Sequence, residues 1–157
     1  MFSFQPEARR GAPGDVWLEP ESLTVLSSGG VKVSFFGGLN VGRVGEPEAS
    51  EDGVVVAASL EDLLAFKLKL VVQRVEAKDY LDVAAILGTG LPLEHGLAAA
   101  ESLFAPDLPP MVVLKALTYF EGGDLSSLPA DVRETLCAAV AGVGDLPQVS
   151  LRAESLS

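Results

Sequence analysis

Four of the chain's eleven lysines and arginines lie within twelve residues of an otherwise acidic sequence: Lys67, Lys69, Arg74 and Lys78. Two carboxylates, Asp79 and Asp82, follow directly and are three residues apart. Cations and carboxylates on neighbouring helical turns suit phosphate binding, and the carboxylates could hold either a metal ion beside the phosphate or the cations themselves. The first hypothesis is therefore a site for a phosphate-bearing ligand.

Lys67 is notable for its place on the helix predicted from about residue 60 to the mid-seventies. At about 100° per residue, Leu60, Leu64 and Val71 surround it, so the apolar stripe is predicted to be centred on Lys67. Arg74 falls in the same stripe. Because an unpaired buried charge costs several kcal/mol, each cation needs a carboxylate, an anionic ligand or water in a cleft.

The same spacing is also typical of a structural ion-pair network. Arg74, Lys78, Asp79 and Asp82 could join two helices while the long stems of the cations cover apolar surface. The spacing leaves the ligand site and the ion-pair network open as alternatives.

Short strands are expected ahead of these residues. Residues 15–36 alternate as in a β-hairpin, with a Ser-Ser-Gly-Gly turn at 27–30 and with Pro20 marking an edge strand. The Gly-rich, Pro-rich and acidic stretch 37–53 is typical of a surface loop. The run 53–58, Gly-Val-Val-Val-Ala-Ala, predicts a short strand buried on both faces.

Two helices should carry the charged residues. The first is expected to begin after Ser59, with Asp62 three residues later in a near capping box. The second is expected over 77–87 and to end at Gly88.

Three shorter helices are predicted in the remainder, each with proline near its start. They span 91–104, 109–120 and 129–143, and the tail 148–157 could add a last strand or be frayed. Cys137 is expected on the buried side of the last of these helices. The order predicts an α+β protein with a small sheet and helices in residues 1–88, and a helical annex in residues 89–157.

The composition excludes several classes of protein. Eleven basic against twenty-two acidic residues give a net charge of −11, which disfavours general affinity for nucleic acid or anionic membrane. With Cys137 the only cysteine and His95 the only histidine, an intrachain disulfide and a multi-histidine metal site are excluded. No apolar run approaches the roughly 18 residues of a spanning helix, and the first residues lack the apolar stretch of a secretion signal. We therefore expect a cytoplasmic protein.

A family resemblance is carried by two motifs that follow the apolar run. The first is Ser-Leu-x-Asp-Leu-Leu-Ala-x-Lys from Ser59 to Lys67, and the second is Arg-x-x-x-Lys-Asp-Tyr-x-Asp from Arg74 to Asp82. This stretch resembles the nucleotidyltransferase-like family of AbiEii/AbiGii type, the toxins of type IV toxin–antitoxin and phage-defence systems. The resemblance extends from about Val31 to Leu87.

The resemblance implies a partial polymerase-β-like fold and assigns roles to individual residues. Lys67 and Asp79 would be catalytic residues, with Lys67 contacting phosphate, while Arg74, Lys78 and Asp82 would order the nucleotide pocket. A nucleoside triphosphate is the implied ligand, and an antitoxin protein is an implied partner.

The chain departs from the family at its metal-binding motif. It contains no Gly-Ser followed some ten residues later by Asp-x-Asp, so no metal-binding residue is assigned, and Mg²⁺ is expected only with such a motif upstream. We therefore expect nucleotide binding with little or no transfer activity, in a protein that forms homo-oligomers. The alternative is a non-catalytic module that uses the same fold, with an open sheet edge, to bind itself or a partner.

Overall fold

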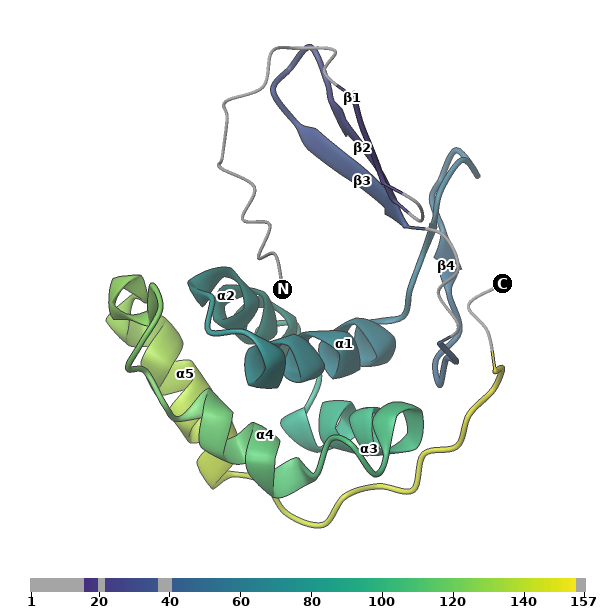
Figure 1. Cartoon of the computed structure of the whole chain (residues 1–157). Helices are drawn as coiled ribbons and strands as arrows, with labels where there is room; N and C mark the ends of the chain where they lie inside the picture. Colours follow the sequence, from purple (N-terminus) through teal and green to yellow (C-terminus); the bar gives the residue numbers. More distant parts are fainter. Residues whose placement is uncertain (1–15, 20–21, 37–40, 155–157) are drawn as a thin grey trace, which may run out of the picture. The chain divides into compact units, whose positions relative to one another are not determined.

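The computed structural model describes residues 16–19, 22–36 and 41–154. The chain forms two compact units, one ending at Asn40 and the other beginning at Val41, and each is described by itself (Figure 1). The predicted α+β class is confirmed, since five α-helices and two small antiparallel sheets lie in the described part of the chain.

The first unit contains a three-stranded antiparallel sheet of order β1-β2-β3. Its strands are β1 (Val16–Glu19), β2 (Ser22–Leu26) and β3 (Lys32–Phe36). The predicted hairpin is instead a three-stranded meander, because β1 and β2 pair with each other. Pro20, expected to mark an edge strand, lies outside the described residues. The predicted turn at 27–30 joins β2 to β3.

The register of β2 and β3 separates apolar from polar side chains. Leu23 lies opposite Phe35 and Val25 opposite Val33, so these four share one face. Thr24 lies opposite Ser34 on the other face, where their hydroxyl oxygens are 2.8 Å apart in a hydrogen bond.

The second unit begins with a short ribbon of two strands, β4 (Glu48–Ala49) and β5 (Val56–Ala57). The prediction that residues 53–58 form a strand buried on both faces is wrong, because Val54, Val55 and Val56 are 78%, 59% and 64% exposed. A continuous apolar run is typical of a central strand that is covered on both faces. Among the described residues, however, β5 pairs with β4 alone.

Five helices follow the ribbon, and all were expected from the sequence. They are α1 (Leu60–Gln73), α2 (Ala77–Leu87), α3 (Leu93–Phe104), α4 (Pro110–Leu117) and α5 (Ala130–Ala141), with a 3₁₀ turn at Leu125–Ser127. Proline lies at or beside the first residue of α3, α4 and α5, because its fixed φ suits a helix start and its missing N–H is not needed there. None of the helices in the described part of the chain has the length and apolarity to cross a membrane.

The hydrophobic core of this unit lies around α1, which packs against α2, α3 and α4 (Figure 1). Leu64 and Leu68 of α1 are fully buried with Leu97 of α3. The closest approach is at Gly96, where a Cβ would overlap the Leu64 side chain. The predicted core and annex meet near residue 88, and the helices on both sides of that position share this one core.

The buried face of α1 differs from the predicted stripe. It is formed by Leu64, Leu68 and Val71, whereas Leu60 is 45% exposed. Lys67 therefore lies at the border of the buried face rather than at its centre, and its side chain is 27% exposed. An amphipathic pattern locates a helical face only to within about one residue, and the neighbouring helices decide which side is covered.

Candidate functional site

The candidate site lies where the end of α1 meets the start of α2. Arg74 is the residue that ends α1, and Asp79 is in the first turn of α2. Arg74 Nε donates to Asp79 Oδ2 at 2.7 Å, and a terminal nitrogen of Arg74 donates to Oδ1 at 3.1 Å. Because the pair is bidentate and the Asp79 carboxylate is fully buried, it fixes the angle at which α2 leaves α1.

Lys67 joins this pair from two turns earlier on α1. Its Nζ lies 3.3 Å from Asp79 Oδ1 and 2.5 Å from Asp82 Oδ2, so it bridges the two carboxylates. Asp79 and Asp82 can both reach it because residues three apart lie on one face of a helix. We call Lys67, Arg74, Asp79 and Asp82 the Lys67 cluster. Its two cations and two carboxylates have no net charge.

Lys78 does not belong to the cluster, although the sequence grouped it there. Its Nζ lies 2.7 Å from Glu76 Oε2, and its side chain is 63% exposed. The residue precedes Asp79 by one position, which turns its side chain about 100° away on the helix. The observed pairing resembles the ion-pair alternative, with Lys67 in the place predicted for Lys78.

The electrostatics of the cluster follow from this pairing. Burial by itself raises the pKa of Asp79, but the hydrogen bonds and charges of Arg74 and Lys67 outweigh it and leave the pKa below its ordinary value. Partial burial likewise lowers the pKa of Lys67, and the Asp82 and Asp79 carboxylates more than compensate, so the pKa is raised. The pairing therefore favours the charged forms of Asp79 and Lys67.

The cluster has a buried side and an accessible side. Asp79 accepts three hydrogen bonds and is fully buried, while Asp82, Arg74 and Lys67 are 49%, 39% and 27% exposed. No group of three His, Cys, Asp or Glu side chains among the described residues is arranged to hold a metal ion. The carboxylate of Asp82 is the one that a ligand could reach.

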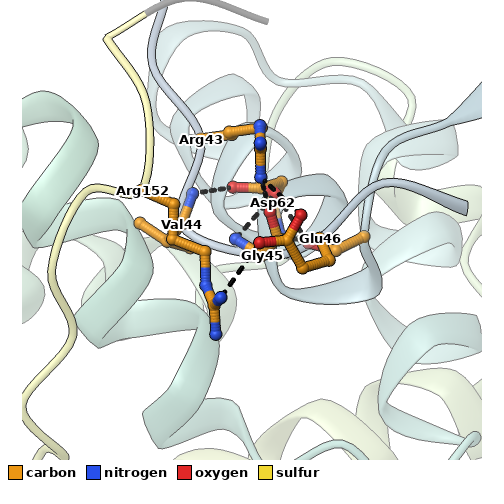
Figure 2. Close-up of polar contacts among 7 residues, drawn as sticks. Arg43, Val44, Gly45, Glu46, Asp62 and Arg152 are labelled. Carbon is orange, nitrogen blue, oxygen red and sulfur yellow. Dashed lines mark hydrogen bonds and ion pairs between the residues drawn. The ribbon is translucent and has the colours of Figure 1, made fainter.

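A second buried carboxylate, Asp62, was expected only to help cap α1 (Figure 2). The predicted cap is confirmed, since the Ser59 hydroxyl accepts a hydrogen bond from Asp62 N at 3.1 Å. The Asp62 carboxylate, however, accepts hydrogen bonds from the main-chain N–H groups of Val44 at 2.8 Å and Gly45 at 3.1 Å. It also accepts one from the Ser59 hydroxyl at 2.6 Å. Asp62 therefore ties residues 44–45 onto the start of α1.

This attachment corrects the predicted loop 37–53. Residues 37–40 lie outside the described residues, but Val44 and Gly45 are buried. A Cβ on residue 45 would overlap the Ser59 side chain, so the close approach requires glycine. The sequence signal for this contact was one Gly within a Gly-rich stretch, which by itself does not locate a partner.

The end of the chain is also attached to this loop. Arg43 N donates to the carbonyl of Ala153 at 3.0 Å, a single bridge in place of the predicted last strand. Glu46 pairs with Arg43 at 3.0 Å and with Arg152 at 2.9 Å (Figure 2). These pairs are largely exposed, so we attribute little stability to them.

The two remaining candidates of the sequence are on the surface. Cys137, predicted to lie in the core, is exposed, because α5 buries Leu136 instead. His95 is partly exposed, and its Nδ1 lies 3.2 Å from Glu61 Oε1.

Comparisons of the chain with models of protein families, with curated proteins and with solved structures give no match. The resemblance to nucleotidyltransferases of AbiEii type therefore depends on the two sequence motifs. Those motifs lie on α1 and α2, the helices that build the Lys67 cluster.

Proposed function

We propose that this chain is a nucleotidyltransferase-like protein of AbiEii type that binds a magnesium nucleoside triphosphate at the accessible side of the Lys67 cluster. One observation carries the proposal. Four of the five residues that the family resemblance assigns to the pocket lie together, and three of them, Lys67, Arg74 and Asp82, are partly exposed to solvent. The finer assignment to a polymerase-β-like fold is part of the same proposal.

A magnesium nucleotide suits this site because it brings a negative phosphate for Lys67 and a positive magnesium ion for Asp82. Phosphate alone would have to displace Asp82 from Lys67 and leave that carboxylate without a partner. Lys67 would hold a triphosphate oxygen and Asp82 would hold the magnesium ion that comes with it, so both members of the ion pair would keep a partner of opposite charge. Mg²⁺ commonly takes one or two carboxylates and the phosphates of its nucleotide, so the single accessible carboxylate fits an ion that arrives with the ligand.

Each residue of the Lys67 cluster has its own role in the proposed binding. Asp79, held by Arg74, keeps Lys67 in place, and Lys67 orients the phosphate. Lys78, which the resemblance also assigns to the pocket, pairs with Glu76 instead and has no role in this proposal. The bound metal would neutralise the triphosphate and align it for transfer. Because the Gly-Ser and Asp-x-Asp motif is missing from the sequence, we propose binding with little or no transfer by this chain.

Replacement of Lys67 by alanine is expected to weaken magnesium nucleotide binding by about tenfold or more, the effect of losing one charge-assisted hydrogen bond. Titration calorimetry with ATP, GTP, CTP and UTP in the presence of Mg²⁺ measures it. Lys115→Ala is the matched control, since this exposed lysine on α4 removes the same charge away from the cluster. Absence of binding below millimolar nucleotide, or equal losses in both variants, would contradict the proposal.

A second candidate function, self-association as a non-catalytic module, is supported by the sheet of the first unit. Val33 and Phe35 are 41% and 58% exposed on the same face as the half-buried Leu23 and Val25. Three strands are about the smallest sheet that is stable by itself, and burial of this apolar face against a second copy would stabilise it further. Although the whole chain is acidic, Lys32 is the one charged residue from 22 to 36, so charge repulsion does not oppose pairing of two such faces.

In this case Phe35→Glu should convert a dimer into a monomer, because it places a charge on the apolar face. Light scattering after size exclusion measures the mass. Ser34→Glu, one residue away on the opposite face, should leave the dimer intact. A monomeric wild-type protein at high concentration would rule out this function.

A further inference from the structure

The ribbon of β4 and β5 exposes an unusual amount of apolar surface. Val54, Val55 and Val56 are 78%, 59% and 64% exposed. Consecutive residues of an extended chain point to opposite faces, so both faces of β5 are apolar and uncovered. A continuous apolar run of this kind is typical of a strand with a neighbour on each side.

Within the described part of the chain, the hydrogen bonding of the ribbon leaves one edge of β5 free. Ser50 N donates to the carbonyl of Val55 at 2.8 Å, and Ala49 lies opposite Val56. In an antiparallel pair, hydrogen-bonded and non-hydrogen-bonded positions alternate, so the N–H and C=O of Val56 point away from β4. Among the described residues, β4 is the only strand paired with β5.

The turn that presents this edge is held in place by its own side chains. Asp52 Oδ1 accepts hydrogen bonds from the Ser50 hydroxyl at 2.6 Å and from Val54 N at 3.1 Å. Gly53 takes a positive φ of 67°, which favours glycine. These hydrogen bonds, that from Ser50 first, lower the pKa of Asp52 and keep it charged. A preformed edge loses less conformational entropy when it binds a strand.

The surroundings of the valines are acidic. Exposed carboxylates follow one another on and beside β4 and in the turn: Glu46, Glu48, Glu51 and Asp52. From residue 44 to residue 66 the sequence contains no lysine or arginine, and Arg43 and Arg152 both pair with Glu46. A binding partner that brings positive charge is therefore favoured, whereas a second copy would bring the same four carboxylates against these.

We infer that the free edge of β5 is the docking site of a partner protein, which adds an extended apolar segment flanked by lysine or arginine as a third strand. The main chain of Val56 binds the segment, the valines contact its apolar side chains, and the carboxylates select its charge. The inference is independent of nucleotide binding, because no residue of the ribbon belongs to the Lys67 cluster.

A labelled peptide with an alternating Val-Thr centre of six residues and two lysines at each end is the probe. Fluorescence anisotropy with the full chain should give saturable binding that weakens as salt is raised. A peptide with glutamate in place of lysine should not bind, and neither should one with proline at the centre, which removes a main-chain donor. Amide chemical-shift changes confined to residues 54–57 would locate the site on β5.

The double variant Glu48→Lys, Glu51→Lys reverses two charges beside β5 and should lower the affinity for the lysine peptide about tenfold or more. Glu134→Lys, on the exposed surface of α5, should leave this affinity unchanged. Three results would overturn the inference. They are no binding up to millimolar peptide, equal binding of the lysine and glutamate peptides, and self-association of the chain that Val56→Lys abolishes.

Discussion

Replacement of Asp79 by alanine is expected to lower the free energy of unfolding by about 3 kcal/mol, the typical effect of removing one member of a buried ion pair. The carboxylate is fully buried and accepts two hydrogen bonds from Arg74 and one from Lys67. Without it, the ion pair that Arg74 keeps among the described residues is the distant one with Glu76, at 3.9 Å. Urea denaturation followed by circular dichroism measures the change.

The effect of Asp79 should also depend on pH. Since its pKa in the folded chain lies below the unfolded value of about 3.9, the carboxylate stabilises the fold above that pH and loses this effect as the pH falls through the folded pKa. The difference between wild type and Asp79→Ala should therefore be constant near neutral pH and shrink below about pH 4.

Asp82→Ala is the control for this prediction. Asp82 contacts the same Lys67 but is half exposed, so its loss should lower the free energy of unfolding by no more than about 1 kcal/mol. If the two variants lose equal stability, or if the effect of Asp79→Ala does not change on acidification, the Asp79 carboxylate does not hold α1 and α2 together.

Asp62→Ala is expected to lower the free energy of unfolding by about 3 kcal/mol, because each buried donor left without an acceptor costs roughly 1–3 kcal/mol. The variant removes the acceptor of the Val44 and Gly45 N–H groups, and these residues are buried. Besides a lower denaturation midpoint, we expect faster hydrogen exchange at both amides.

Two control variants separate the attachment of residues 44–45 from the other effects of losing this carboxylate. Ser59→Ala removes the helix cap and should lower the free energy of unfolding by about 1 kcal/mol, less than Asp62→Ala. Asp131→Ala removes a carboxylate from the first turn of α5, where it is exposed, and should have little effect. Unchanged exchange at Val44 and Gly45 in Asp62→Ala would show that this carboxylate does not attach residues 44–45.

The helices were predictable because their signals are local. Ser59 caps α1, and Pro92, Pro109 and Pro129 precede the three later helices. Each signal acts through the φ angle or the hydrogen-bonding groups of a few adjacent residues. The same holds for the turn between β2 and β3, where Gly30 takes a positive φ of 77°.

Which face of each helix or strand is buried could not be predicted from local signals. A run of valines meets the requirement of a central strand, but whether neighbours flank β5 depends on segments distant in sequence. Cys137 and Leu136 are adjacent and both apolar, and the packing of α5 buries only Leu136. In α1, similarly, the sequence placed Lys67 at the centre of the apolar stripe, and the positions of α2, α3 and α4 put it at the border.

For the candidate site, the sequence determined which charges come near one another, because Lys67 and Arg74 precede Asp79 and Asp82 on two consecutive helices. Only the tertiary structure decided how those charges pair: Arg74 on the buried Asp79, Lys67 between two carboxylates, and Lys78 turned to Glu76. It also assigned Asp62 to the main chain of residues 44–45. The physical reason is that the sequence period gives only the direction in which a side chain points from its own helix axis. Its ion-pair partner and its burial depend on which other segments of the folded chain lie next to it.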